Sequence, residues 1–255
     1  MHRIWPPHAA GAPDDGPLDD GQLDEAALER LYTYPAPPWL VVNFVASADG
    51  AVELGGRAAA LSNAPDRRVL QLGSDLADVL LVGATTAVVE EFRGVHPDAQ
   101  TTQRRARHGL APIPPTAVVT TGRSLPADAP VVTEALVPSI VLTTADAPPD
   151  KRRAWTEAGA TVLVTGEHTV DLRAGVAALA ARGLGRIDCE GGPRLFGALL
   201  AAGVVDELRL TVSPLLVAGA AERIAAGAGV EPATLELASV VTEADTLLVR
   251  YLLRR

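Results

Sequence analysis

Apolar positions along the chain recur with two different periods, and the pattern switches between them many times. Short runs of Val, Leu and Ile, or strict apolar–polar alternation, predict strands at 39–46, 77–82, 117–120, 139–143, 160–164, 187–190, 208–212, 235–241 and 246–253. Apolar residues three and four apart predict helices at 23–34, 149–158 and 170–182, and helices that begin after residues 63, 83 and 192. Strands alternating with helices predict a three-layer α-β-α fold of the α/β class, with a mostly parallel central sheet and antiparallel C-terminal strands.

The same pattern divides the chain into an N-terminal arm, residues 1–38, and one domain, residues 39–255. Residues 1 to about 22 are rich in Pro, Gly and Asp, so they bury little and are expected to be mobile. The short helix at 23–34 ends before a proline cluster. We expect it to pack on the domain or on a partner subunit.

Two segments of the domain leave alternatives open. Residues 92–115 are polar and basic and predict a solvated loop, which in an enzyme would serve as a substrate lid. Residues 208–217 are strongly apolar for strands near the end of a sheet, and an uncovered edge favours association. An isologous homodimer would cover this edge. The alternative is that the terminal hairpin or the arm covers it within one chain.

Composition excludes several classes of protein. The 255 residues are 48% hydrophobic but only 4% aromatic, so the core is built from Val, Leu and Ala. A net charge of −9 argues against nucleic acid or an anionic membrane surface as a partner. The single cysteine, Cys189, forms no internal disulfide and indicates a reducing compartment, which we take to be the cytoplasm. We see neither a basic-then-apolar signal pattern nor an uncharged run long enough for a membrane span.

Glycines stand where two predicted strands pass into helices. After the strand that ends at Glu190 come Gly191, Gly192 and Pro193, and proline suits the first position of a helix. The unpaired N–H groups of such a helix start favour a bound phosphate, although a tight turn that needs glycine only for its backbone is the alternative. Gly83, followed by Thr85 and Thr86, is a second candidate, for which helix capping by the threonines is the alternative.

Four candidate groups share the carboxyl ends of predicted strands, where α/β sheets bind ligands. They are Asp49, Gly83, Thr121 and Glu190. Zinc-binding Cys-x-x-Cys and His-Glu-x-x-His motifs, the phosphate-binding Gly-x-x-x-x-Gly-Lys loop, the Gly-x-Gly-x-x-Gly fingerprint and the Gly-x-Ser-x-Gly elbow do not occur. We therefore expect no metal site and no covalent catalysis. The pattern favours an enzyme whose reactivity belongs to a cofactor.

Three blocks of the sequence, in this order, carry a family resemblance. They are Ser47-x-Asp49-Gly50, Val82-Gly83-Ala84-x-Thr86, and Glu190-Gly191-Gly192-Pro193 together with Asp206-Glu207-Leu208 and Ser213-Pro214. The chain resembles the reductase domain of riboflavin biosynthesis, of the dihydrofolate-reductase-like superfamily, over about residues 39–253. The deaminase domain that often precedes this reductase has His-x-Glu and Pro-Cys-x-x-Cys signatures, and these do not occur here.

The resemblance implies hydride transfer from NADPH to a 5-amino-6-ribosylaminouracil 5′-phosphate, whose opened sugar forms an imine. It implies cofactor contacts at Ala46, Gly83, Thr85, Thr86, Thr121, Arg123, Gly191, Gly192, Pro193, Arg194 and Leu195. It implies substrate contacts at Asn43, Ser47, Ser62 and Arg67, with catalytic roles for Glu190 and Asp49. Within these sets, Arg123 is assigned to the cofactor 2′-phosphate by charge, and Arg67 to the substrate phosphate.

Two positions depart from the family pattern. Asn43 stands where the riboflavin enzymes commonly carry a lysine, and Ala58 where a serine is expected. Both positions would touch substrate rather than cofactor. A pterin, as in dihydrofolate reductases, or another pyrimidine therefore stays open as substrate. A non-catalytic NADP-binding protein of the same fold is a further alternative.

Overall fold

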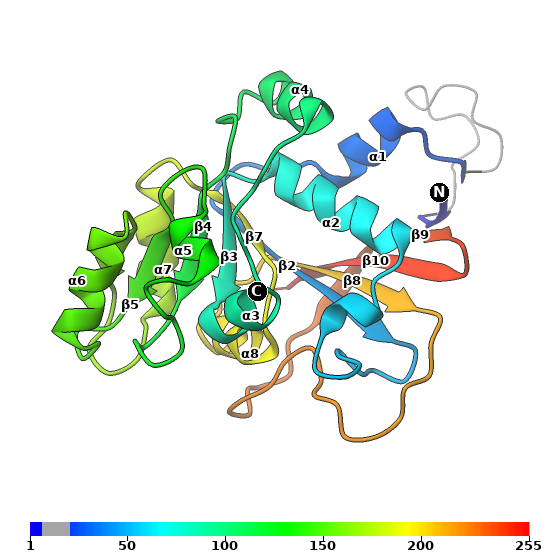
Figure 1. The fold of residues 1–255 in the computed structure, drawn as a ribbon. Helices are drawn as coiled ribbons and strands as arrows, with labels where there is room; N and C mark the ends of the chain where they lie inside the picture. The colour runs from blue at the N-terminus through cyan, green and yellow to red at the C-terminus, as the bar shows by residue number, and fades with distance from the viewer. Residues whose placement is uncertain (7–20, 255) are drawn as a thin grey trace.

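A ten-stranded sheet organises the structure, a computed structural model that describes residues 1–6 and 21–254 (Figure 1). Its strands are β1 (His2–Trp5), β2 (Trp39–Ser47), β3 (Val79–Gly83), β4 (Thr116–Val119), β5 (Ile140–Thr143), β6 (Thr161–Val164), β7 (Arg186–Cys189), β8 (Glu207–Ser213), β9 (Leu235–Glu243) and β10 (Thr246–Leu253). Their order in the sheet is β1-β9-β10-β8-β2-β7-β3-β4-β5-β6. The strands from β8 to β6 in this order run parallel, whereas β10, β9 and β1 add antiparallel. This confirms the predicted class.

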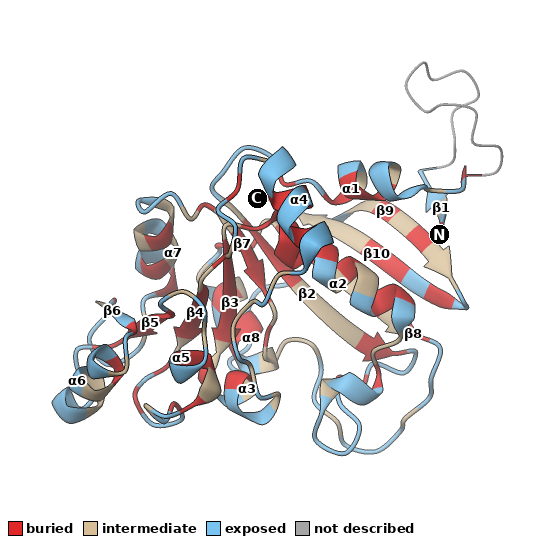
Figure 2. Cartoon of the chain, turned by 45° about the horizontal axis from the view of Figure 1, so that its top comes forward, coloured by how far each residue is buried: buried red, intermediate tan, exposed pale blue. Residues whose placement is uncertain are grey.

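Helices cover both faces of the sheet (Figure 2). They are α1 (Glu25–Tyr32), α2 (Ala64–Leu76), α3 (Ala84–Val89), α4 (Ala99–Arg107), α5 (Pro130–Thr133), α6 (Pro149–Glu157), α7 (Leu172–Ala180) and α8 (Pro193–Ala201), with the short 3-10 helix η2 (Ala58–Ala60). On one face α1 and α2 pack against one hydrophobic cluster, and α3, α5 and α6 pack against a second. On the other face α7 and α8 enclose the third.

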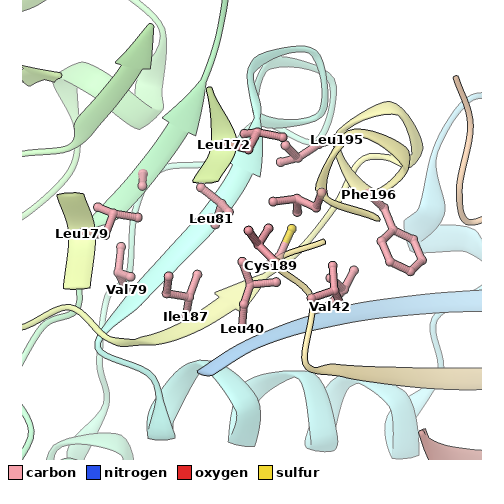
Figure 3. Close-up of a cluster of buried hydrophobic side chains, with 14 of the residues drawn as sticks. Leu40, Val42, Val79, Leu81, Leu172, Leu179, Ile187, Cys189, Leu195 and Phe196 are labelled. Atoms are coloured by element: carbon pink, nitrogen blue, oxygen red, sulfur yellow. The ribbon is translucent and has the colours of Figure 1, made fainter. Parts of the chain in front are cut away.

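The cluster beneath α7 and α8 shows why strands β2, β3 and β7 read as apolar runs. Leu40, Leu81 and Cys189 from these strands meet Leu195 and Phe196 of α8 (Figure 3). The alternate residues of the same strands face the opposite helices, as Val41 and Leu80 do. Both faces of these parallel strands are therefore covered, which is the arrangement that continuous apolar runs indicate.

The structure differs from two predictions, one for the N-terminal residues and one for residues 208–217. Residues 1 to about 22 were expected to be mobile, yet His2–Trp5 form β1 and pair with β9; residues 7–20 lie outside the described part. β8 is an internal strand between β10 and β2, so the predicted uncovered edge at 208–217 is wrong. The alternative holds: the β9–β10 hairpin covers β8, and the arm in turn covers β9.

The polar segment 92–115 is also not a simple loop, because residues 99–107 form α4. Asp98 caps this helix by accepting the Thr101 N–H at 2.7 Å. Arg104 of α4 is buried, where it pairs with Asp75 of α2 and with Glu29 of α1. α4 lies beside the C-terminal end of α2, so the lid prediction is wrong for this helix.

Candidate active site

The two predicted glycine steps meet at the carboxyl ends of β3 and β7. The Gly83 N–H donates to the Gly191 carbonyl oxygen at 2.8 Å. Gly192 lies so close to Thr86 that a Cβ on this glycine would collide with the threonine Oγ1. Pro193 occupies the first turn of α8, as predicted, and the first N–H groups of this helix have no partner within it. Two helix starts therefore converge at one point of the sheet edge.

A cavity of about 490 Å³ opens beside this point, between α2 and the sheet. Eight predicted site residues line it: Asn43, Ser62, Arg67, Thr85, Thr86, Glu190, Gly192 and Pro193. Its side chains include Glu53, Asp66, Glu90 and Glu222, which were not predicted, and Arg67 lies exposed at the mouth. Among the described residues that line it there is no histidine, cysteine or lysine, so carboxyl groups dominate its ionisable chemistry.

Glu190 projects into this cavity from the end of β7. Its Oε1 accepts a hydrogen bond from the Ser74 hydroxyl of α2 at 3.0 Å. Burial raises the pKa of Glu190, and this hydrogen bond opposes the rise only in part. The carboxyl group is thus fixed at one oxygen, while its other oxygen accepts no hydrogen bond from the described residues.

Asn43 lies next to Glu190 on the cavity wall, and a second carboxylate stands behind it. The Asn43 Nδ2 donates to Oδ1 of Asp188, which is completely buried on β7. Burial first, and then the negative charge of Glu190, raises the pKa of Asp188 to about 8, although Arg209 opposes the shift.

Arg209 of β8 supplies a buried positive charge on the same face of the sheet. Its Nε donates to Glu207 Oε1 at 2.9 Å, and its Nη2 donates to the Tyr32 carbonyl oxygen at 3.0 Å. The rings of Tyr32 and Tyr34 each lie 5.0 Å from the guanidinium carbon. Burial alone would raise the pKa of Glu207, but Arg209 and Arg250 outweigh it and hold that pKa at about 2.

Asp49 and Ser47, assigned to catalysis and substrate, do not line the cavity. The Ser47 hydroxyl donates to Asp49 Oδ1 at 2.5 Å, and Asp49 also accepts the Ala218 N–H at 2.7 Å. These bonds, led by that from Ser47, lower the pKa of Asp49 to about 2. The carboxylate ties the turn after β2 to the loop after β8.

The remaining cofactor predictions lie around the cavity rather than on its wall. Thr121 and Arg123 are exposed at the end of β4, and Arg194 is 87% exposed, with Glu222 Oε1 at 4.0 Å from its Nη2. The side chains of Ala46 and Leu195 are buried, so Leu195 offers a ligand only its backbone. Gly83 and Gly191 form the junction beneath the helix starts, without lining the cavity.

Sequence reasoning missed two buried charged residues, Arg209 on the cavity wall and Asp188 behind it. Asp188 and Arg209 each interrupt an apolar strand, and a charged residue inside such a strand was the available signal. Asp66 on the cavity wall, which accepts from Ser62 Oγ at 2.5 Å, was not predicted either.

This geometry defines an α/β fold with a cavity at the carboxyl edge of its sheet, lined by the Glu190 carboxyl group and the start of α8. The sequence pattern of the RibD C-terminal domain matches residues 38–249, and the chain belongs to this family. The predicted resemblance is therefore confirmed, and it places the chain among oxidoreductases.

Curated relatives match most of the chain. A 2,5-diamino-6-ribosylamino-4(3H)-pyrimidinone 5′-phosphate reductase of Methanothermobacter thermautotrophicus is 28% identical over 220 residues, 84% of this chain and 97% of the relative. One of the same name from Archaeoglobus fulgidus is 28% identical over 183 residues, 71% and 83% of the two chains.

Solved structures share the fold. A pyrimidine reductase-like protein of Corynebacterium diphtheriae superposes with a TM-score of 0.78 at 22% identity, over 89% of this chain and 99% of that one. The riboflavin biosynthesis reductase of Saccharomyces cerevisiae superposes with a TM-score of 0.61 at 14% identity, over 88% and 97%. No helix among residues 1–6 and 21–254 is long and apolar enough to cross a membrane.

Proposed function

We propose that this protein reduces a ribosylaminopyrimidinone 5′-phosphate of riboflavin biosynthesis, with NADPH as the reductant. One observation carries the proposal: Glu190 and Gly192, two residues apart, both line the cavity. The carboxylate of the first faces the site of a ring, and the second opens a helix start suited to a phosphate. Side chain and backbone of one short segment therefore serve two ligands that must lie side by side for hydride transfer.

The residues present fit a dinucleotide at the helix starts. A Cβ at position 192 would collide with Thr86 Oγ1, so only glycine lets the start of α8 and the threonine hydroxyl lie side by side. The backbone N–H groups of Arg194 and Leu195, the hydroxyls of Thr85 and Thr86, and the exposed guanidinium of Arg123 would hold NADPH. When bound, NADPH would supply the hydride.

The chain's own residues would bind and orient the substrate. Glu190 would accept hydrogen bonds from a ring N–H and, as an anion, would stabilise the iminium form of the opened sugar. Arg67 at the cavity mouth would pair with the 5′-phosphate. The curated relatives are named for the 2,5-diamino-4-pyrimidinone ring, and we adopt this ring in place of the predicted uracil as the substrate to test first.

A second candidate substrate is a pterin such as dihydrofolate. Two observations favour it: Asn43 replaces the usual lysine, and Arg67 is accompanied by Glu53, Asp66 and Glu90 on the cavity wall. An acidic wall disfavours a doubly charged phosphate ester.

The deciding experiment follows NADPH oxidation by the purified protein with the diaminopyrimidinone nucleotide, its uracil counterpart and dihydrofolate in parallel. We expect the diaminopyrimidinone nucleotide to be turned over with the highest kcat/KM, and NADPH to be used in preference to NADH. Turnover of dihydrofolate alone would select the pterin. Cofactor binding without turnover of any of the three would indicate a non-catalytic NADP-binding protein.

Two further parts of the proposal concern the setting of the reaction. We place the enzyme in the cytoplasm, where its single cysteine, buried and unpaired, stays reduced. We also propose a homodimer, now on the basis of the exposed Leu215 and Leu216 on the loop after β8 rather than of a sheet edge.

A further inference from the structure

A buried row of polar side chains crosses the sheet at the cavity wall, which two of its members, Asn43 and Arg209, line. Asp188 stands on β7, Asn43 on the adjacent β2 and Arg209 on the next strand, β8, where it is the register partner of Asn43. Gly73 of α2 covers the row: a Cβ there would lie 2.9 Å from Asp188 Oδ2, 3.3 Å from Arg209 Nη1 and 3.4 Å from Asn43 Nδ2. Three strands and one helix therefore meet at this polar contact.

When Asp188 is ionised, the row has a fixed hydrogen-bond polarity. Arg209 can only donate, and its charge attracts an oxygen to the side where Asp188 Oδ2 lies. Within the described residues, Arg209 Nη1 and Asp188 Oδ2 both lack a hydrogen-bond partner and form no ion pair with each other, so Arg209 acts on Asp188 through its charge alone. The other oxygen of Asp188 accepts from the Asn43 Nδ2. The Asn43 amide group thus turns its NH2 toward Asp188.

The consequence appears on the cavity side of Asn43. Because its NH2 group is engaged behind the wall, the amide presents its carbonyl oxygen Oδ1 to the cavity that Asn43 lines. Glu190, which lines the same cavity, offers its second carboxylate oxygen. The wall therefore offers two neighbouring acceptors.

Two neighbouring acceptors distinguish the two rings of the proposed function. In a 2-amino-4-pyrimidinone, the ring N3–H and the 2-amino group are adjacent donors, and they match Glu190 and Asn43 together. In a uracil, N3–H lies between two carbonyl oxygens, and its pair of adjacent donors, N1–H and the 6-amino N–H, lies on the edge that carries the sugar and therefore faces the cofactor rather than this wall. Either orientation that gives N3–H to Glu190 then places a carbonyl oxygen against Asn43 Oδ1, an acceptor against an acceptor.

We propose that Asp188 is a positioning residue that holds the Asn43 amide with its oxygen toward the cavity, so that this site selects 2-aminopyrimidinone rings over uracils. The proposal rests on the proposed function, and it names the residues that decide the ring. Asp188 itself touches no ligand and acts through Asn43. The charge of Arg209 determines that an oxygen of residue 188 lies on the Arg209 side.

The test uses titration calorimetry in the presence of NADP⁺ at pH 8.5, above the Asp188 pKa of about 8. It measures binding of the two rings as 6-ribitylamino 5′-phosphates, whose sugar chain keeps the N1 edge away from the wall: 2,5-diamino-6-ribitylaminopyrimidin-4-one, called here the triamino ring, and 5-amino-6-ribitylaminouracil. The wild type is expected to bind the triamino ring at least about 10-fold more tightly, the scale of one mismatched buried hydrogen bond. In Asp188→Asn, Arg209 would attract the oxygen of the new amide, whose NH2 would then face Asn43. The Asn43 amide would have to turn over and show its NH2 to the cavity. The preference is therefore expected to reverse toward the uracil.

Two further variants separate positioning from stability. Asn43→Leu keeps the volume and removes both polar atoms, so the ring preference should fall to within about 2-fold while the protein stays folded. Asp75→Asn is the matched control: Asp75 is also a buried aspartate on this face, paired with Arg104 away from the cavity. It should lower the melting temperature and leave the ring preference intact.

The outcomes separate this inference from the proposed function. A wild type that binds the triamino ring no better than the uracil overturns the inference. The inference is also overturned if Asp188→Asn folds and keeps the wild-type ring preference. If Asp188→Asn does not fold, Asn43→Leu with the wild-type ring preference overturns it instead. If those variants lose the preference but the wild type oxidises no NADPH with the diaminopyrimidinone nucleotide, the inference stands and the proposed function fails.

Discussion

Replacing Gly73 by alanine tests how closely α2 packs on the polar row of Asp188, Asn43 and Arg209. The substitution is expected to change the free energy of unfolding in the opposite direction from the usual effect of glycine to alanine in a helix. In an exposed helix interior, glycine to alanine stabilises by about 1 kcal/mol. At position 73 the new methyl group would lie 2.9 Å from Asp188 Oδ2, closer than a real Cβ contact allows. Asp188 is 0% exposed and does not line the cavity, so it has no free space to move into. Overpacking of this kind costs about 1–3 kcal/mol. We therefore expect Gly73→Ala to be neutral to destabilising by about 2 kcal/mol once the helix gain is subtracted.

Gly175 of α7 is the matched control for this prediction. It also lies inside a helix, but a Cβ there would be 3.4 Å from Leu142 Cδ1, an ordinary van der Waals contact. Gly175→Ala should therefore stabilise by up to about 1 kcal/mol. Urea unfolding followed by circular dichroism gives both free energies, provided that the slopes agree. Equal stabilisation by the two substitutions would refute the close approach of α2 to Asp188 and Arg209.

Three further predictions follow from the site. Glu190→Gln is expected to lower turnover by about 10²-fold or more with little change in NADPH affinity, whereas Gly192→Val should abolish NADPH binding first; equal losses of NADPH affinity would contradict the division of roles. Folded Asp188 keeps its proton up to a pKa of about 8 and the unfolded chain releases it near 3.8, so this group's contribution to stability falls as pH rises between those values. Asp188→Asn should accordingly gain stability relative to wild type by up to about 1.4 kcal/mol per pH unit from pH 5 to 8, measured by urea unfolding; a constant difference would show an ordinary pKa. Leu216 is 82% exposed, and Leu216→Glu should convert the proposed dimer to monomer in light scattering; a monomeric wild type would remove the dimer proposal.

Local patterns in the sequence were sufficient for most of the fold. The strands and helices of the domain follow the periodicity because each buries a continuous face. The periodicity did not predict α4, because only Ala99 and Ala106 of its nine residues are apolar. Ion pairs such as Arg104–Asp75 hold this helix in place instead. The periodicity did not predict β1, because these four residues form a strand only by pairing with β9, more than two hundred residues away in the chain.

The residues of the candidate site likewise fall into those that local sequence predicts and those that it does not. Glu190, Gly192 and Thr86 belong to short local blocks, and the structure gathers these three on the cavity. Asp188 and Arg209 have no local signature, since their meaning depends on which strands become neighbours. Strand order follows from the packing of the whole sheet and not from any one segment.

The position of β2 in the sheet has a consequence for the newly made chain. β2 is the second strand of the chain, yet both of its neighbours, β7 and β8, are synthesised roughly 140 residues or more after it. At about 5–20 residues per second, this strand leaves the ribosome many seconds before either edge can be paired. Until then its run Leu40–Val42 is an unpaired apolar template for other chains. Slow translation or a shortage of chaperones should therefore reduce the yield of this protein more than its final stability suggests.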